Sequence, residues 1–392
     1  MAGSHEHPPL RRYTLLGASS LTVMAGATIS PTIPAMQDHF SEVPEVALLT
    51  RLVLTVPGLF IALFSLLAGA VVDRFGRKRL LIFSTLLYAL SGSAGLVLDD
   101  LSLILASRAV LGIAVAGVMT SATTLIGDYF SGPARDRFMG LQAAFMGFGG
   151  VVFLLAGGWL GDWHWRGPFG VYLLALLLIP GMIRGIYEPP RHRPRGADTG
   201  EPPRLPRWRV AGLYLAALAG MLTFYMVPVQ IPYRLRELGL GSSALAGLTV
   251  ATCTLCSALT ATQFGRIREY LTHPAILALS FVLLGAGLVV AGWVDRYLQL
   301  LPGMALVGMG MGLMMPNFSL WLMGLAPLPL RGRVVGGLTM AIFIGQFVSP
   351  LVVMPLLAVT DIAGSLRYTG SGAGALGLVI GGGALLGWAG RR

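Results

Sequence analysis

Charged side chains are scarce in this sequence, and their scarcity excludes an ordinary soluble protein. Only 11% of the 392 residues are Asp, Glu, Lys or Arg, while 55% are hydrophobic; soluble domains carry about 25% charged residues. Apolar runs of about 18 residues or more are typical of transmembrane helices. We find twelve such segments, from 14–36 to 371–389. None alternates with a period of two, so we predict helices rather than the strands of a barrel.

Ionisable groups are missing from the middles of these segments, with one exception described below. All 17 acidic residues and all six histidines fall at segment ends or in loops. Because no Ser/His/Asp set, pair of acids or metal-ligand cluster is present, we expect no enzyme, no metal and no other cofactor. The two cysteines, Cys253 and Cys256, lie in one predicted helix without further ligands, so we interpret them as packing residues.

The net charge of +11 is distributed unevenly along the chain. If the N-terminus lies in the cytoplasm, 21 of the 28 Lys and Arg residues fall in cytoplasmic segments. This asymmetry follows the positive-inside rule. It predicts a multi-pass protein of the cytoplasmic (inner) membrane with both termini in the cytoplasm. We expect contact with the lipid bilayer, no nucleic-acid partner, and a monomer.

A polar linker divides the apolar segments into two sets of six. Residues 188–209 contain six Pro and six Arg, a composition typical of an extended linker. We therefore predict an N-terminal six-helix bundle over 1–187, a cytoplasmic linker over 188–208, and a C-terminal six-helix bundle over 209–392.

Several features recur at an offset of 196 residues, which is half the chain. The matching positions are Gly69 and Gly265, Asp73 and Glu269, Arg135 and Arg331, Arg137 and Arg333, and, within one or two residues, Pro31 with Pro228 and Pro34 with Pro232. A parallel repeat of this kind is typical of transporters that rock about a central site.

A dense cluster of charge, GAVVDRFGRKRLL at 69–81, stands between the second and third apolar segments. Gly69 lacks a side chain and would let a neighbouring helix approach closely. Gly76 would permit a tight turn. Asp73 falls at a helix end, where a carboxylate needs a donor or a positive helix N-terminus.

The pattern Gly69-x-x-x-Asp73-Arg74-x-Gly76-Arg77-Lys78 resembles the loop 2–3 motif of the major facilitator superfamily, and the resemblance covers the whole chain. It implies an all-α membrane protein with twelve transmembrane helices in two pseudo-symmetric six-helix bundles. It also implies a latch of the outward-open state, in which the Asp docks at the start of span eleven near Arg333 and an Arg pairs with an acid at the end of span four. The predicted latch residues are Gly69, Asp73, Arg74, Gly76, Arg77 and Asp128.

Arg108 is the one charge well inside a segment, about 10 Å along its helix. Arg108 and Gly112 resemble the superfamily's span-four motif, Arg-x-x-x-Gly, which implies a role in substrate binding or proton-coupled switching. The alternative is an Arg that extends along the helix to reach the outer surface.

The resemblance implies that spans 1, 4, 7 and 10 surround a cavity, with 2, 5, 8 and 11 at its flanks. Polar, Met and aromatic residues of these spans are candidates for substrate binding, because buried amides and hydroxyls need partners. Besides Arg108, the candidates are Thr28, Thr32, Thr120, Gln142, Phe145, Met146, Tyr225, Gln230, Asn317, Trp321, Phe343 and Gln346. For each, the alternative is an interhelical hydrogen bond or plain packing.

The sequence most resembles the drug/proton antiporter branch, because Gly157 and Gly158 and the later Trp165-Arg166 match exporters, although Phe153-Leu154 stands where exporters have Gly-Pro. We predict a secondary transporter that exports a small amphipathic molecule by alternating access, with protons as a second candidate partner. An uptake permease or uniporter for a small neutral or anionic metabolite is the alternative. A non-transporting sensor or scaffold is a third reading, which no additional domain supports.

Overall fold

The computed structural model describes residues 9–189, 205–327 and 330–389, apart from the side chains of 66, 68–70, 73, 136 and 384–389. Every regular element within these ranges is helical, which confirms the all-α prediction. The N-terminal bundle consists of α1 (Pro9–Ala27), η1 (Ser30–Thr32), α2 (Ile33–His39), α3 (Val46–Phe75), α4 (Arg77–Ser93), η2 (Ala94–Leu96), α5 (Leu101–Tyr129), α6 (Gly132–Trp163), η3 (Gly167–Leu178) and α7 (Ile179–Gly185). The C-terminal bundle consists of α8 (Arg207–Glu237), α9 (Ser243–Tyr270), α10 (His273–Trp293), α11 (Tyr297–Leu325), α12 (Arg331–Leu357) and α13 (Ile362–Ala389).

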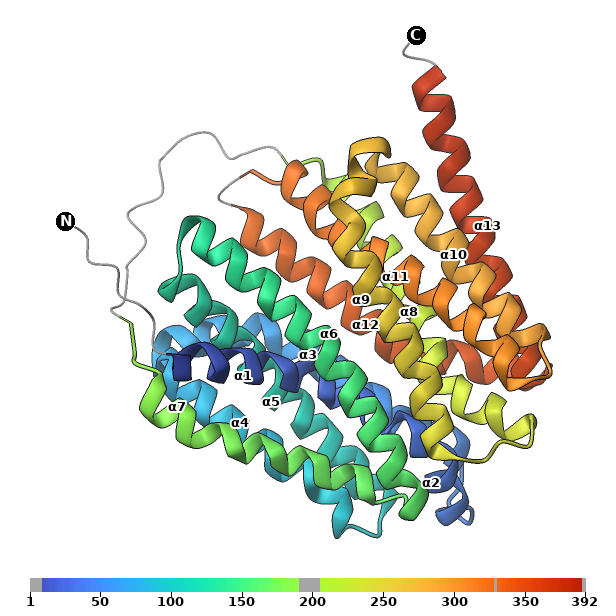
Figure 1. Ribbon diagram of the computed structural model, residues 1–392, viewed down its shortest axis with the longest axis horizontal. Coiled ribbons are helices and arrows are strands. Elements are labelled where there is room, and N and C mark those ends of the chain that lie inside the picture. Colours follow the sequence, from blue (N-terminus) through green and yellow to red (C-terminus); the bar gives the residue numbers. More distant parts are fainter. Residues whose placement is uncertain (1–8, 190–204, 328–329, 390–392) are drawn as a thin grey trace.

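Ten of the helical segments in the described ranges are long and apolar enough to cross a membrane. α1 and α13, one in each bundle, complete the twelve spans that the sequence predicts (Figure 1). The first span is not continuous over 14–36, because α1 ends at Ala27 and a short 3-10 turn precedes α2. Pro31 and Pro34 explain the break, since neither can donate a backbone hydrogen bond inside a helix.

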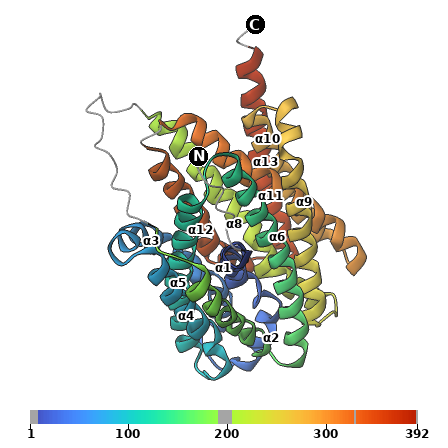
Figure 2. The ribbon, with the colours of Figure 1, turned by 60° about the vertical axis from the view of Figure 1, so that its left-hand side comes forward.

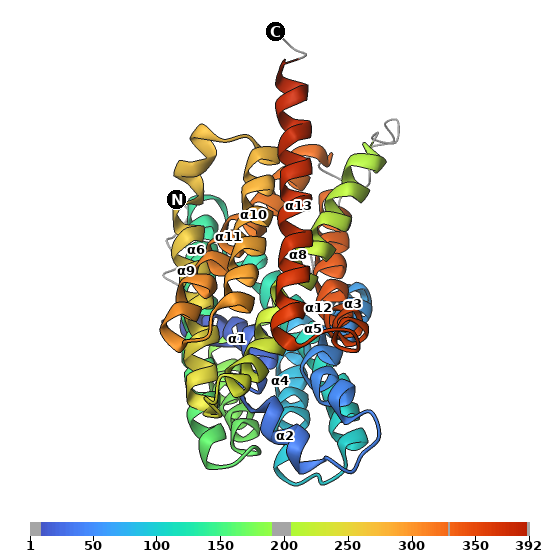
Figure 3. The same ribbon diagram turned by 90° about the vertical axis from the view of Figure 1, so that its right-hand side faces the viewer.

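Each bundle has its own apolar core. Tyr88, Phe169 and Tyr172 are fully buried in the first, and Phe281 and Phe318 in the second. In the second bundle α10 packs against α13, which lies along the outer side of the molecule (Figure 3). Between the bundles, α6 packs against α9 and α3 against α12 (Figures 1 and 2).

Because the helices alternate in direction, their ends form two faces. We call the end that carries 75–77, 129–132, Gly185 and Arg207 the linker face, because α7 ends and α8 begins there. The opposite end, which carries His39–Val46, Trp163–Gly167 and Glu237–Ser243, is the far face.

Hydrogen bonds and an ion pair join the two bundles at the far face. Arg236 pairs with Asp38 of α2. The hydroxyl of Tyr233 donates to Gln37 Oε1 at 2.7 Å. Deeper in the molecule, Ser30 Oγ donates to the carbonyl of Pro228 at 2.6 Å. Spans one and seven are therefore fastened together on this side.

The contact between α6 and α9 is close at the far face and opens toward the linker face. A methyl group added to Gly158 would lie 3.2 Å from the Cα of Gly247, and one added to Gly147 would lie 3.1 Å from the Cβ of Ala258. Further along the same faces, a methyl group on Gly140 or on Gly265 would have no described atom within 4 Å. The bundles thus touch near the far face and diverge toward the linker face.

Candidate functional site

A cavity of about 510 Å³ lies between the two bundles. Helices α1, α3, α5 and α6 line one side, and α8, α9, α11 and α12 line the other. These are the eight spans that the sequence resemblance implies around and beside a cavity. Four of the predicted residues line it: Met146, Tyr225, Phe343 and Gln346.

The lining is apolar and, among the described residues, carries no Asp, Glu, Lys, Arg or His. Its polar groups are Thr22, Tyr225, Thr254, Ser257 and Gln346. Five methionines contribute thioether side chains, which adapt to irregular shapes; they are Met119, Met146, Met221, Met311 and Met315. Such a wall suits a small molecule that has a large apolar surface and few polar groups.

Several lining residues were missed by sequence reasoning, notably Met221, Phe224, Met311 and Met315. The signal that could have found them is their spacing. Met221 and Phe224 precede Tyr225 by four and one positions, and Met311 and Met315 are four apart, so each set falls on one helix face. The candidates had been chosen by residue type and not by helix face, so these four residues were passed over.

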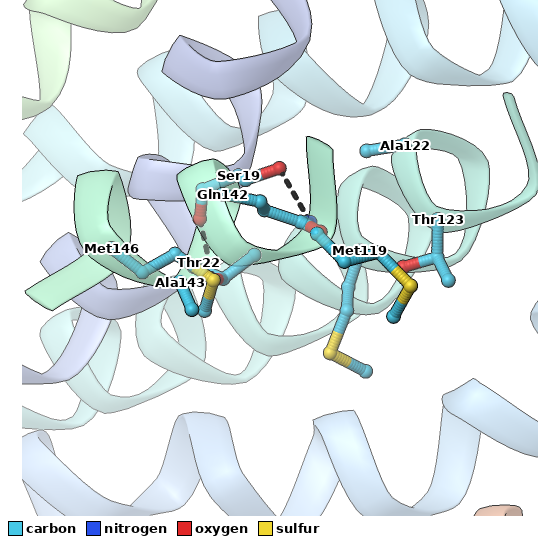
Figure 4. Close-up of a pocket in the computed structure, with 9 residues that line it drawn as sticks. Ser19, Thr22, Met119, Ala122, Thr123, Gln142, Ala143 and Met146 are labelled. Carbon is cyan, nitrogen blue, oxygen red and sulfur yellow. Dashed lines mark hydrogen bonds between the residues drawn. The ribbon is translucent and has the colours of Figure 1, made fainter. Parts of the chain in front are cut away.

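A smaller cavity of about 330 Å³ adjoins the first within the N-terminal bundle. It lies among α1, α5 and α6, and the two cavities share Thr22, Met119, Ala143 and Met146. Gln142 lines it and donates from Nε2 to Ser19 Oγ at 2.8 Å (Figure 4). The predicted Gln142 therefore faces a side chamber of the central cavity.

Other predicted residues lie outside both cavities. Thr28 and Thr32 are buried, and their hydroxyl groups donate to backbone carbonyls close by in the sequence. Thr28 donates to Met24 O and Thr32 to Ile29 O, each at 2.9 Å. The carbonyl of Thr120 accepts from Thr124, and Phe145 is partly exposed on α6. Their substrate-binding role stays a prediction.

Asn317 and Trp321 both contact His273, a residue that the sequence analysis did not single out. Asn317 Oδ1 lies 2.7 Å from His273 Nδ1, and Asn317 Nδ2 donates to the His273 carbonyl at 3.0 Å. The Trp321 ring stacks on the imidazole at 5.5 Å between centroids. This cluster fixes the start of α10 against α11 near the linker face.

Gln230 is fully buried in α8, and neither its amide nitrogen nor its amide oxygen has a hydrogen-bond partner in the described part of the chain. A buried amide without partners destabilises the conformation that contains it. Gln230 lies between the central cavity and the fastened far face, so it is placed to meet water or ligand only if that face opens.

Arg108 is fully buried inside the N-terminal bundle and lines neither cavity. Its Nη2 donates to the carbonyl of Gly92 in α4 at 2.5 Å, and its guanidinium lies over the rings of Phe169 and Tyr172. Its Nε and Nη1 have no partner among the described residues. The side chain therefore neither reaches the surface nor meets the cavity in this conformation, and its substrate-binding role stays a prediction.

Two tyrosines next to Arg108 hold the end of α1. Tyr88 donates to the carbonyl of Leu21 at 2.8 Å, and Tyr172 donates to the carbonyl of Ala25 at 2.9 Å. Ala25 lines the central cavity where α1 breaks. The Arg108 cluster thus supports one wall of the cavity from behind.

The charged loop between α3 and α4 is bound to its own bundle. Gly76 adopts φ 90°, a conformation that favours glycine. Arg77 Nε lies 3.1 Å from Asp128 Oδ2. Glu188 accepts from the backbone amides of Arg77 and Lys78 at 2.7 and 2.8 Å, so its carboxylate stabilises the N-terminus of α4. Arg74 is exposed, whereas the burial of Gly69 and the side chain of Asp73 lie outside what the structure describes.

A protein-family model described as Major Facilitator Superfamily matches residues 15–350. The puromycin resistance protein pur8 of Streptomyces alboniger is 32% identical over 173 residues, and that match spans 42% of this chain but only 33% of pur8. The class C tetracycline resistance protein of Escherichia coli is 26% identical over 362 residues, which are 88% of this chain and 89% of that protein.

A solved structure of a bacterial homolog of the human lysosomal transporter Spinster, in an inward-facing and occupied conformation, has a similar fold. Its TM-score is 0.74, over 97% of this chain and 95% of that chain, at 14% sequence identity. At this identity the likeness concerns the fold alone.

Proposed function

We propose that this chain, which belongs to the Major Facilitator Superfamily, exports small amphipathic molecules across the cytoplasmic membrane by alternating access. It is a multi-pass membrane transporter and not an enzyme. The observation that carries the proposal is the uncharged, methionine-rich cavity between bundles that diverge toward the linker face. The positive-inside rule assigns the linker face to the cytoplasm, so the cavity of this conformation opens to the side on which an exporter loads its cargo, as export requires. The names of two relatives, resistance proteins for puromycin and tetracycline, support the same direction.

We propose that the cycle exchanges contact at the far face for contact at the linker face. α3 and α12 run antiparallel and meet at Gly58, where an added methyl group would lie 3.0 Å from Gln346 Cδ. Counting the same number of residues along each helix from this contact toward the linker face reaches Asp73 on α3 and Arg331, the first residue of α12. Docking of the Asp73 carboxylate on that helix N-terminus would close the linker face, as the loop motif implies.

Transport of radiolabelled chloramphenicol, an uncharged aromatic amide, tests the direction. Inverted membrane vesicles should accumulate it, and right-side-out vesicles should not. Vesicles containing Gly158→Trp serve as the control, because the indole cannot fit against Gly247 and α9. Accumulation only in right-side-out vesicles would favour the uptake permease, and equilibration without accumulation in both orientations would favour the uniporter. Equal signals from the wild type and Gly158→Trp would contradict transport of this compound.

Energy coupling is expected to depend on the rim of the molecule, because no carboxylate is found among the described residues of the cavity wall. A proton carrier needs a group that changes protonation between the two conformations. Asp38, paired with Arg236, and Asp128, paired with Arg77, are the candidates. In proteoliposomes with an imposed pH gradient we expect one of two results. Either the wild type shows no gradient-driven accumulation, or one of the two substitutions, Asp38→Asn or Asp128→Asn, abolishes it. Steep accumulation that survives both substitutions would contradict this assignment.

A further inference from the structure

Two uncharged polar side chains meet near the closed, far-face end of the central cavity. They are Tyr225 of α8 and Gln346 of α12. No hydrogen bond joins the Tyr225 hydroxyl or the Gln346 amide to another described residue, and both residues line the cavity. Because both groups line the cavity, the partners available to them are a bound ligand or water inside the cavity. Buried polar groups without partners are costly unless a ligand or ordered water satisfies them.

Two glycines bring these groups together. A methyl group placed on Gly26 would lie 2.9 Å from the Tyr225 hydroxyl oxygen and 3.8 Å from Gln346 Nε2. One placed on Gly58 would lie 3.2 Å from Gln346 Nε2. The hydroxyl and the amide therefore surround the same small space, which stays open because positions 26 and 58 carry no side chain.

The chemistry of this space is that of neutral hydrogen bonding. The tyrosine hydroxyl and the glutamine amide each supply donors, and the glutamine carbonyl supplies an acceptor. Methionine and aromatic side chains, among them Met221, Phe224 and Met311, form the rest of the wall. We infer that the cavity selects uncharged cargo whose amide or carbonyl group hydrogen-bonds Tyr225 and Gln346 while its apolar body lies against the methionines. This inference rests on the proposed function and adds the chemical class of the cargo.

A charged cargo is disfavoured by the same geometry. Burying an ion without a partner costs far more than burying a neutral polar group. Arg108, the candidate partner for an anion, is held against Gly92 and two aromatic rings outside the cavity wall. No carboxylate stands among the described lining residues to receive a cation. A site built to hydrogen-bond a neutral group rejects analogues that cannot do so.

Three dansyl compounds with the same ring system test the inference: neutral dansylamide, anionic dansyl sulfonate and cationic dansylcadaverine. Binding to the purified, full-length protein in detergent is read by energy transfer from its tryptophans. We expect dansylamide to bind about tenfold or more tightly than either ion. Tyr225→Phe should weaken dansylamide about fivefold, the effect of one neutral hydrogen bond, and Gln346→Leu at least as much. Gly26→Ala should weaken it to at least the extent of Tyr225→Phe.

Matched controls separate binding from folding. Tyr214→Phe removes a hydroxyl of the same helix that bonds the Val334 carbonyl, and Gly212→Ala adds a methyl group that meets no described atom within 4 Å. Both should bind dansylamide as the wild type does. Gln346→Glu should reverse the preference toward dansylcadaverine, a gain that misfolding cannot produce. Equal binding of an ion and dansylamide, no binding of dansylamide to the wild type, or unchanged binding in Tyr225→Phe and Gln346→Leu would overturn the inference. Because this assay involves no flux, its outcome is independent of the transport direction.

Discussion

Replacing Asp162 with Ala is expected to raise, about fivefold, the yield of a disulfide between cysteines placed at positions 140 and 265. The carboxylate of Asp162 accepts from the backbone amides of Ser243 and Ala244, at 2.6 and 3.3 Å, and from Ser242 Oγ at 2.9 Å. A side chain of one bundle thus caps the first turn of α9 in the other. Such caps contribute about 1 kcal/mol, and Asp162 is exposed, which keeps the effect at this modest size. Loss of the Asp162 cap should shift the population of molecules toward the conformation in which the far face is open and the linker face is closed.

The reporter follows from the register of α6 and α9. Contacts of Gly158 with Gly247 and of Gly147 with Ala258 place Gly140 opposite Gly265, where a methyl group added to either residue would meet no described atom within 4 Å. Closing of the linker face should bring cysteines at these two sites together. The measurement uses Gly140→Cys with Gly265→Cys after Cys253→Ser and Cys256→Ser. Asp73→Asn should have the opposite effect, because it weakens the proposed docking on α12.

Asp100 provides the matched control for Asp162. Its carboxylate caps α5 by accepting from the amide of Leu103 at 2.9 Å, but donor and acceptor belong to the same bundle. Asp100→Ala therefore removes an equivalent cap without changing the contact between bundles, and the crosslink yield should stay at the wild-type level. Equal yields for Asp162→Ala and Asp100→Ala would show that the interbundle cap has no role in closure.

Arg108→Met is expected to raise the midpoint of thermal unfolding by a few degrees and to abolish transport. Two guanidinium nitrogens of Arg108 are buried and have no hydrogen-bond partner within the described part of the chain, and the third donates to one neutral carbonyl. Replacing an incompletely satisfied buried charge by an apolar side chain of similar length is often neutral or stabilising. We infer that a charged group that makes this conformation less stable has its role in another conformation of the transport cycle. Its removal should therefore arrest the cycle.

Three measurements check the Arg108 prediction. The unfolding midpoint in detergent should rise, vesicle accumulation of chloramphenicol should fall to the level of the Gly158→Trp control, and dansylamide affinity should stay within about twofold. Arg367→Met is the matched control, since that guanidinium lies over Trp293 and is partly exposed. A lowered midpoint would mean that Arg108 is structural, and a loss of dansylamide binding would place it in the cavity after all.

The all-helical membrane fold could be predicted from the sequence because its signals are local, namely the length of the apolar segments and one densely charged motif. The polarity of Tyr225 and Gln346 stands out inside apolar helices, which made them candidates; both line the cavity, and their substrate-binding role stays a prediction. The sequence could not show which face of a helix meets the cavity. Arg108 illustrates this limit, since the same position along α5 can point toward the cavity or toward α4, and the rotation depends on aromatic residues more than sixty positions away.

Contacts between distant segments were the second limit. The binding of Glu188 to the start of α4, and of Asp162 to the start of α9, depends on the three-dimensional approach of helix ends. Both residues look like ordinary loop acids in the sequence. The break of α1 after Ala27, by contrast, was readable in Pro31 and Pro34, but a criterion based on apolar length passes over it.

Gly140 and Gly265 carry a consequence for how sequence variation in this chain should be interpreted. In the conformation described here a methyl group at either site would meet no described atom within 4 Å, and alanine is the better helix former, so the alanine variants should fold at least as stably as the wild type. Selection against such variants would then act only through the conformation in which the two helices meet there. A survey of natural variants would find these positions constrained without any visible structural reason, and the degree of constraint would record how closely the linker face closes.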